Sequence, residues 1–198
     1  MDTGNKIARI ISDIFVPPTF VVLSFIYLAF LLETTSDQKY LIIGTAVLFG
    51  LILPVVFFII LRMKRKINDN DAFIKEQRTI PYSAGVVFCA IAIIVLSIFN
   101  NPFPIVTYFW VIYIISMIGM LIINYKWKIS AHAIGSSILL GLLLFGNSIL
   151  FLYHLILVIV ICWARLRLKM HTKSQIIAGV LYGFLLTYIQ LNIYTGFL

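Results

Sequence analysis

Charged residues are scarce in this sequence. Asp, Glu, Lys and Arg together make up 11% of the 198 residues, whereas hydrophobic residues make up 62% and the mean hydropathy is +1.08. Soluble domains carry about 25% charged residues. The composition therefore argues against a soluble domain and predicts an integral membrane protein.

Cysteine is almost absent as well. Cys89 and Cys162 both fall inside apolar stretches, where lone cysteines usually act as small hydrophobic residues. This argues against a disulfide-stabilised scaffold and against a cysteine metal site. No cleaved signal peptide is expected, because Pro17-Pro18 interrupts the first apolar run and no small-residue cleavage site ends it.

Long apolar runs, in contrast, fill most of the chain. They cover residues 14–33, 41–62, 82–99, 104–124, 131–147, 148–163 and 174–195. A membrane span needs about 20 residues, so the pattern predicts an all-α, polytopic membrane bundle of six or seven transmembrane helices. Only Gly146-Asn147-Ser148 separates the fifth run from the sixth, which predicts a tight hairpin. We expect one membrane domain over residues 1–198.

The basic residues predict an orientation. With seven spans, one face receives the N-terminus and the connections 62–81, 125–130 and 164–173, which together carry fourteen of the fifteen Lys and Arg residues. The positive-inside rule then places this face in the cytoplasm. We therefore expect an integral protein of a bacterial inner membrane. Residues 5–13 are predicted to form an amphipathic helix on its surface.

The formal net charge of +8 is typical of contact with anionic lipid headgroups when the cations flank membrane spans. Basic residues interleaved with aromatic ones, as in single-strand binders, do not occur outside the spans. The lipid bilayer is thus an expected partner and nucleic acid is not. Protein partners remain open.

Two histidines stand beside basic residues at the ends of apolar runs. The first occurs in Lys128-Ile129-Ser130-Ala131-His132. Ser130 is a good helix N-cap, and it places His132 in a first helical turn, where backbone N–H groups favour an anion. Taken alone, His132 also fits an interfacial histidine that reaches toward lipid headgroups.

The second histidine, His171, follows a stretch in which Arg165, Arg167 and Lys169 alternate with apolar residues. A period of two predicts a non-helical connector. Thr172 and Gln175 fit a capping box at the start of the last helix. Because His171 and Gln175 are four residues apart, they can also meet on one helical face. Gln175 is therefore either a cap alone or also the group that orients the imidazole.

A third polar segment precedes the third span. Lys75 and Arg78 share a face if this segment is helical, and an Arg fork matches phosphate oxygens. Ordinary cytoplasmic anchors are the alternative. Two spans separate each polar segment from the next, so all three segments should return to one face. One phosphate site is then predicted from Lys75, Arg78, His132, Arg165 and His171.

The three segments resemble, in order, the motifs of the type 2 phosphatidic-acid phosphatase superfamily: K-x6-R-P, P-S-G-H and S-R-x5-H-x3-D. The third motif is matched by Ala164-Arg165, His171 and Gln175 with the spacing intact, and the second by Ile129-Ser130-Ala131-His132. The resemblance covers about residues 62–185.

The first motif is the loosest. Arg78 is present, but Asp71 stands where the lysine is expected, and Pro81 follows three residues after Arg78. Lys75 is the nearest substitute for the missing lysine.

The resemblance implies an all-α phosphatase core in which His171 attacks phosphorus and becomes a phosphohistidine. His132 would protonate the leaving alkoxide, and Gln175 would orient His171 in place of the family's aspartate. The phosphoryl oxygens would be bound by Arg165, Arg78, Lys75 and Ser130. The reaction would need no metal or cofactor.

The leading hypothesis is thus an enzyme that releases phosphate from a membrane lipid mono- or diphosphate. The alternative is a catalytically impaired or non-catalytic member of the same fold, acting as a membrane subunit or lipid-binding protein; the neutral Gln175 favours it. A prenyltransferase, indicated only by the acidic run 68–71, is disfavoured because no Asp or Glu follows Glu76 to supply a second acidic motif. His154, in the sixth run, is predicted to be structural.

Overall fold

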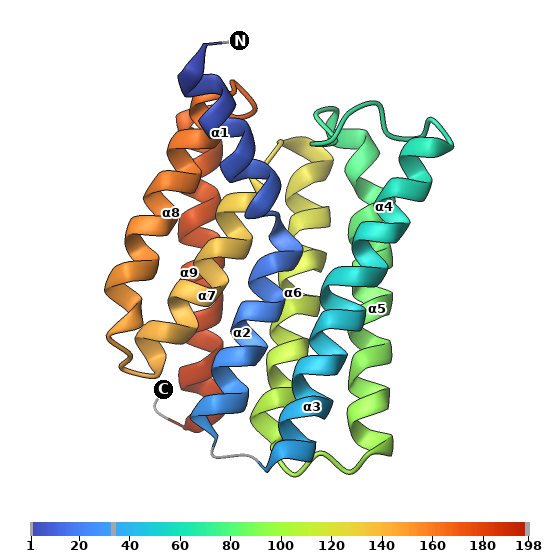
Figure 1. Ribbon diagram of the computed structural model, residues 1–198, viewed down its shortest axis with the longest axis vertical. Helices are drawn as coiled ribbons and strands as arrows, with labels where there is room; N and C mark the ends of the chain where they lie inside the picture. The colour runs from blue at the N-terminus through green and yellow to red at the C-terminus, as the bar shows by residue number, and fades with distance from the viewer. Residues whose placement is uncertain (1, 33–34, 197–198) are drawn as a thin grey trace. The chain divides into compact units, whose positions relative to one another are not determined.

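The computed structural model describes residues 2–32 and 35–196, and within these ranges it contains helices and no strand, with 82% of the residues helical. The prediction of an all-α bundle is therefore confirmed. In chain order, the helices are α1 (Thr3–Ile14), α2 (Pro17–Leu31), α3 (Ser36–Thr45), the π-helical η1 (Ala46–Ile52), α4 (Leu53–Met63), the 3₁₀ turn η2 (Lys75–Arg78), α5 (Thr79–Ile98), α6 (Pro104–Lys126), α7 (Ala131–Phe145), α8 (Leu150–Arg167) and α9 (Lys173–Thr195) (Figure 1).

Five helical segments of the described residues are long and apolar enough to cross a membrane: Ser36–Met63, Lys75–Ile98, Pro104–Lys126, Leu150–Arg167 and Lys173–Thr195. The pair α1 and α2, bent by 53° at their junction, would make a sixth. Helix α7 has 15 residues and is shorter than a full span. Length and composition therefore support the lower end of the predicted six or seven spans.

The chain packs as two compact units. Unit 1 comprises Met1–Phe20 and Lys128–Leu198, and unit 2 comprises Val21–Trp127. The predicted site residues divide between them. The expectation of one domain over residues 1–198 stays a prediction.

In unit 2, an aromatic cluster joins α2 to α6. The ring of Phe25 stacks on Trp110 with centroids 4.4 Å apart, and the Ser24 hydroxyl hydrogen-bonds the Tyr113 hydroxyl at 3.1 Å. Pro54 lies in the first turn of α4; it lacks an N–H and crowds the turn before it. That preceding turn is the wider π-helical η1. Gly50 in that turn lets Val21 approach, since an added Cβ would collide with the Val21 side chain.

Helix α7 is the central helix of unit 1. Its residues from His132 to Leu143 are all buried, and α9 packs along it. A Cβ added to Gly183 would lie 2.5 Å from the Ile134 carbonyl oxygen, and one added to Gly141 would lie 2.9 Å from the Phe184 carbonyl oxygen. Higher-numbered residues of α7 contact higher-numbered residues of α9, so the two helices run parallel. The glycines allow the close approach that is common between membrane helices.

Helix α8 returns antiparallel to α7 through the predicted hairpin. The connection runs from Gly146 to Ile149, with Asn147 in a left-handed conformation at φ 47°. The Nε2–H of His154 donates to the Ser136 carbonyl at 2.7 Å. His154 thus fastens α8 to α7, as expected of a structural residue. The starts of α7 and α9 and the end of α8 consequently lie at one end of unit 1.

The predicted non-helical connector over Arg165–Lys169 is wrong. Helix α8 continues through Arg167 and ends in a Schellman motif, in which Lys169 N–H donates to the Leu166 carbonyl and Met170 N–H to the Arg165 carbonyl. Lys169 takes the left-handed position at φ 55°. The alternation of basic and apolar residues therefore reflects long arginine side chains at a helix end and not an extended backbone.

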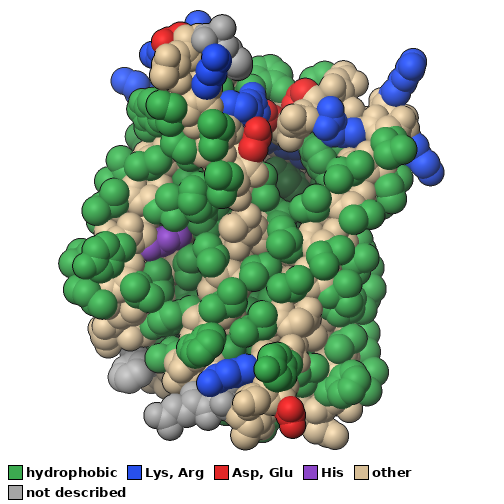
Figure 2. Space-filling view, in the orientation of Figure 1, with side chains coloured by type: hydrophobic (Ala, Val, Ile, Leu, Met, Phe, Trp, Pro, Cys, Tyr) green, Lys and Arg blue, Asp and Glu red, His purple; other side chains and the backbone are tan. Residues whose placement is uncertain are grey.

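The predicted amphipathic helix over residues 5–13 is α1. Its face containing Ala8 and Ser12 is buried, whereas Ile7, Ile10 and Ile14 are exposed. Helix α1 packs against α8. Large apolar side chains are exposed elsewhere too, and Figure 2 shows hydrophobic side chains over most of the visible surface, as expected of helices in contact with lipid.

Candidate functional site

The side chain of His171 is held by Gln175. Their Nδ1 and Oε1 atoms lie 3.0 Å apart, and the same Oε1 accepts the Thr172 N–H at 3.2 Å. Because a backbone N–H can only donate, the Gln175 amide atom that it faces must be the accepting oxygen and not the NH2 group. The proton in the second bond must therefore be on Nδ1 of His171. In the neutral imidazole, Nε2 then carries the lone pair.

The same contacts confirm the capping box that the sequence predicts. The Thr172 hydroxyl accepts the Gln175 N–H at 3.3 Å, and the Gln175 side chain accepts the Thr172 N–H in return. Gln175 is thus both a helix cap and the hydrogen-bond partner of His171. Of the two interpretations left open by the sequence, a cap alone or a cap that also contacts the imidazole, the contacts fit the second.

Lys128 fixes the turn directly before His171. Its Nζ donates to the Met170 carbonyl at 2.9 Å, across 42 residues of sequence. The Met170 N–H in turn bonds the Arg165 carbonyl at the end of α8. The backbone entering His171 is therefore held from the α6–α7 connection and from α8.

Ser130 caps α7 as predicted. Its hydroxyl oxygen accepts the Ala133 N–H at 3.4 Å, and the residue is fully buried. A serine hydroxyl that accepts one hydrogen bond can still donate its own proton to a ligand. Because α7 and α9 are parallel, the N-terminus capped by Ser130 and that capped by Thr172 lie at the same end of unit 1. Backbone N–H groups that lack an intrahelical acceptor, together with the helix dipoles, make both N-termini favourable to an anion.

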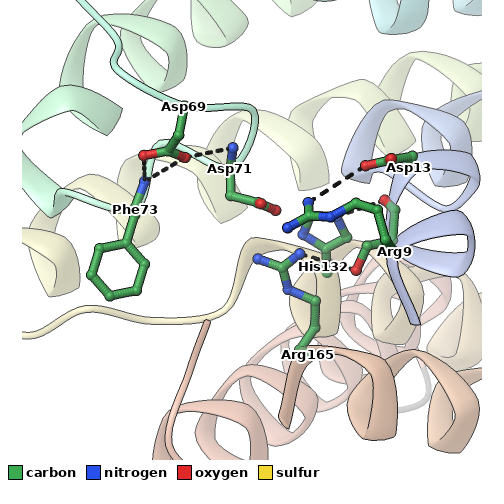
Figure 3. A network of polar contacts seen from close by, with 8 residues as sticks. Arg9, Asp13, Asp69, Asp71, Phe73, His132 and Arg165 are labelled. Carbon is green, nitrogen blue, oxygen red and sulfur yellow. Dashed lines mark hydrogen bonds and ion pairs between the residues drawn. The ribbon is translucent and has the colours of Figure 1, made fainter. Parts of the chain in front are cut away.

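His132 and Arg165 meet the same residue of α1 (Figure 3). The Nε2–H of His132 donates to the Ser12 carbonyl at 3.2 Å, and Nη1 of Arg165 donates to the Ser12 hydroxyl at 3.0 Å. Arg165 is completely buried, and His132 is nearly so. On the same helix, Arg9 and Asp13 form an ion pair at 3.6 Å.

The structure thus places five predicted site residues in unit 1, at the end where α7 and α9 begin and α8 ends: Ser130, His132, Arg165, His171 and Gln175. Two residues that sequence reasoning did not assign to the site belong beside them. Ser12 contacts both His132 and Arg165, and Lys128 supports the turn before His171. The small residues Ala8 and Ser12, four apart on an amphipathic helix, were the available signal for a buried face of α1.

The other two predicted residues, Lys75 and Arg78, lie in η2 of unit 2. Residues three apart eclipse in a 3₁₀ turn, so the expectation of a shared face holds locally. Lys75 Nζ donates to the Tyr125 carbonyl at 2.8 Å, at the end of α6, and pairs with Glu76 at 3.7 Å. The Asn124 amide donates to the Lys75 carbonyl at 2.7 Å. Lys75 thus stabilises a helix C-terminus, and its phosphate contact stays a prediction.

Arg78 is 4% exposed and its Nε donates to the Ala72 carbonyl at 2.7 Å. The loop it supports is also folded by Asp69, whose carboxylate accepts the N–H groups of Asp71 at 2.7 Å and Phe73 at 3.1 Å (Figure 3). Asp69 is therefore used to build its own turn. Across residues 2–32 and 35–196, no group of three or more His, Cys, Asp or Glu residues is placed to hold a metal ion.

Comparison with protein-family models, with curated proteins and with solved structures finds no match for this chain.

Proposed function

We propose that this protein hydrolyses a phosphate ester or diphosphate of a membrane lipid, with His171 as the nucleophile. The supporting observation is the bond from His171 Nδ1–H to Gln175 Oε1, at 3.0 Å. It selects the tautomer in which Nε2 is the nucleophilic nitrogen, and it restrains the ring. An oriented imidazole beside cations and helix N-termini is the arrangement that attack on phosphorus requires.

In the proposed reaction, Nε2 of His171 attacks phosphorus in line with the lipid oxygen. The N–P bond forms as the P–O bond to the lipid breaks, and the departing oxygen takes a proton from His132. His132, now deprotonated, takes a proton from a water molecule whose oxygen attacks phosphorus, and the N–P bond breaks to release inorganic phosphate and His171. The buried guanidinium of Arg165 would neutralise charge on the equatorial oxygens, a large contribution in phosphoryl transfer.

The remaining phosphate contacts follow the motif resemblance. Ser130 would donate its hydroxyl proton. Lys75 and Arg78 belong to unit 2, and their phosphate contacts stay predictions from that resemblance. Both cations already contact backbone carbonyls. Their participation therefore requires either additional donors of the same side chains or a rearrangement when substrate binds.

A membrane lipid phosphate is the proposed substrate class, because its acyl chains can reach the site from the side, between apolar helices. The predicted cytoplasmic orientation of the basic connections would restrict the substrate to the inner leaflet of a bacterial inner membrane. Phosphatidate, phosphatidylglycerol phosphate and a polyprenyl diphosphate share the required chemistry.

Gln175 also supports the second candidate, a non-catalytic lipid-phosphate-binding protein. A neutral amide orients an imidazole but does not stabilise its positive charge. In the serine-protease triad, replacing the aspartate by asparagine lowers turnover by about 10⁴, which sets the scale of the handicap. A site with this handicap would still bind a lipid phosphate.

The deciding experiment measures phosphate release and lipid binding by the purified full chain with a panel of lipid phosphates. The proposed enzyme releases phosphate, forms an acid-labile phosphoenzyme, and loses both in His171→Ala. His154→Gln is the matched control, because His154 lies in the same unit and serves to join α8 to α7. Binding of a lipid phosphate without any release would support the second candidate and contradict the first.

A further inference from the structure

Ser12 of α1 holds the two groups to which the proposed reaction assigns protonation of the leaving group and charge neutralisation. Its carbonyl oxygen accepts from His132 Nε2–H at 3.2 Å, and its hydroxyl accepts from Arg165 Nη1 at 3.0 Å. Both are oxygen acceptors on one residue. A phosphate ester presents the same pair of acceptors, a leaving-group oxygen and a phosphoryl oxygen, to the same pair of donors.

The contact between Ser12 of α1 and Arg165 of α8 is buried. Ser12 is 2% exposed and Arg165 is fully buried, although the two residues are 153 positions apart. Burying a guanidinium has a high desolvation cost unless it is hydrogen-bonded. Ser12 therefore supplies one of the oxygens that Arg165 needs when no anion is bound.

Helix α1 packs against α8 through a small buried face. Its buried residues are Ala8 and Ser12. At its start, Arg167 donates to the Asn5 amide oxygen at 3.0 Å and pairs with the Asp2 carboxylate, and the Arg167 and Asp2 side chains are exposed. Exposed ion pairs contribute little and weaken with salt. The helix therefore has a polar anchor at one end and Ser12 near the other.

The connection to α2 is suited to movement of α1. Phe15 and Val16 are non-helical, and they are followed by Pro17, which cannot donate a backbone bond to continue α1 into α2. On its outer side, α1 exposes Ile7, Ile10 and Ile14. This apolar stripe with Lys6 beside it fits the interface of an anionic bilayer, so α1 has a second favourable location when it leaves the site.

We infer that α1 is a built-in plug of the phosphate site, with Ser12 holding His132 and Arg165 until a lipid phosphate displaces it. This inference rests on the proposed function, and it adds a closed state that lowers the apparent affinity of the site. When the binding-competent state is only a fraction of the population, the apparent dissociation constant rises by the reciprocal of that fraction. Loosening α1 should therefore strengthen substrate binding.

The first test is kinetic. Ser12→Ala removes the hydroxyl acceptor and is expected to lower KM for a lipid phosphate by about 2- to 10-fold, the value of one hydrogen bond. Arg167→Gln, which loosens the exposed anchor, should shift KM in the same direction without altering a buried residue. Ser137→Ala is the matched control, because it removes a buried hydroxyl of α7 in the same unit; its KM should equal that of the wild type. An increase in KM for both Ser12→Ala and Arg167→Gln would overturn the inference.

The second test does not depend on turnover. In a variant with Cys89 and Cys162 replaced by Ala, spin labels are placed at Ile10→Cys on α1 and Ile159→Cys on α8, both exposed positions. Inorganic phosphate should lengthen or broaden the distance between the labels in the full chain. A control pair, Ile159→Cys with Ile177→Cys on α9, should stay unchanged. Arg165→Gln should abolish the response, since it removes the donor that both Ser12 and phosphate use.

The two proposals fail in different ways. Phosphate release with an immobile α1, and with KM unchanged in Ser12→Ala, would overturn the plug and leave the enzyme. Absence of phosphate release from any lipid, combined with a phosphate-dependent movement of α1 that requires Arg165, would overturn the enzyme and support a gated phosphate-binding site.

Discussion

The Nδ1 atom of His171 and the Oε1 atom of Gln175 lie 3.0 Å apart, one helical turn from each other at the start of α9. Because this oxygen also accepts the Thr172 N–H, the imidazole orientation and the helix cap depend on the same amide group. A change at Gln175 will therefore affect the chemistry of His171 and the start of the helix together, and substitutions can be chosen to separate the two effects.

Gln175→Glu is expected to raise turnover by at least about tenfold, because a carboxylate of the same length stabilises the imidazolium that forms during attack. The helix dipole also favours an acid at this position, so the cap should persist. Phosphate release and the yield of trapped phosphoenzyme provide the measurement. Gln175→Leu, which loses both bonds, should lower turnover, and an equal activity of the Glu and Leu variants would show that residue 175 does not act on His171.

Lys128→Met is expected to reduce turnover by about tenfold with little change in KM. The ammonium group bonds the Met170 carbonyl, and without it the turn that presents His171 is released; hydrogen bonds to charged groups contribute about 1.5–3 kcal/mol. Lys173→Met, which removes an exposed cation two residues after His171, is the control. If both variants lower turnover equally, charge near the site is responsible and the position of the turn is not.

Gly183→Ala should lower the stability of the folded protein by about 1–3 kcal/mol, the usual cost of overpacking. The added Cβ would lie 2.5 Å from a backbone oxygen of Ile134, which has little freedom to move. Gly44→Ala is the matched control, since nothing lies within 4 Å of its Cβ position. Thermal unfolding in detergent measures both. A wild-type midpoint for Gly183→Ala would mean that α7 and α9 are separated more widely than described.

The predicted orientation is tested by labelling single cysteines in intact cells, again with Cys89 and Cys162 replaced. Lys66→Cys should resist an impermeant reagent, whereas Asp37→Cys should react, and both positions are exposed. Lysis should make Lys66→Cys reactive. The reverse pattern would place the basic face outside and move the proposed substrate to the outer leaflet.

Local sequence patterns predicted local structure well. The capping box of Thr172 and Gln175 and the cap formed by Ser130 depend on residues three positions apart, and the structure confirms each one. The apolar runs and the hairpin near Asn147 depend on length and turn chemistry. The one local error, at Arg165–Lys169, arose because a helix end that alternates Arg and Leu has the same pattern as an extended segment.

The remaining features of the candidate site depend on contacts between residues that are far apart in the sequence. Ser12 lies 120 positions from His132, and Lys128 lies 42 positions from Met170. Neither pairing has a local pattern in the sequence, because a serine on an amphipathic helix and a lysine beside a span are both common surface residues. The geometry of α1 and α8, and not residue identity, makes Ser12 a neighbour of Arg165.

The burial of α7 has a consequence for how this protein is made. A helix of 15 residues with serines, glycines and a histidine, surrounded by protein along most of its length, is poorly suited to enter the lipid alone. It is expected to insert together with α8 as a helical hairpin, and then to acquire its parallel neighbour when α9 emerges from the ribosome. His171 precedes α9, so this proposed nucleophile would reach its place only at that late step. A nascent chain stopped before Lys173 should therefore be membrane-integrated and yet lack a formed site.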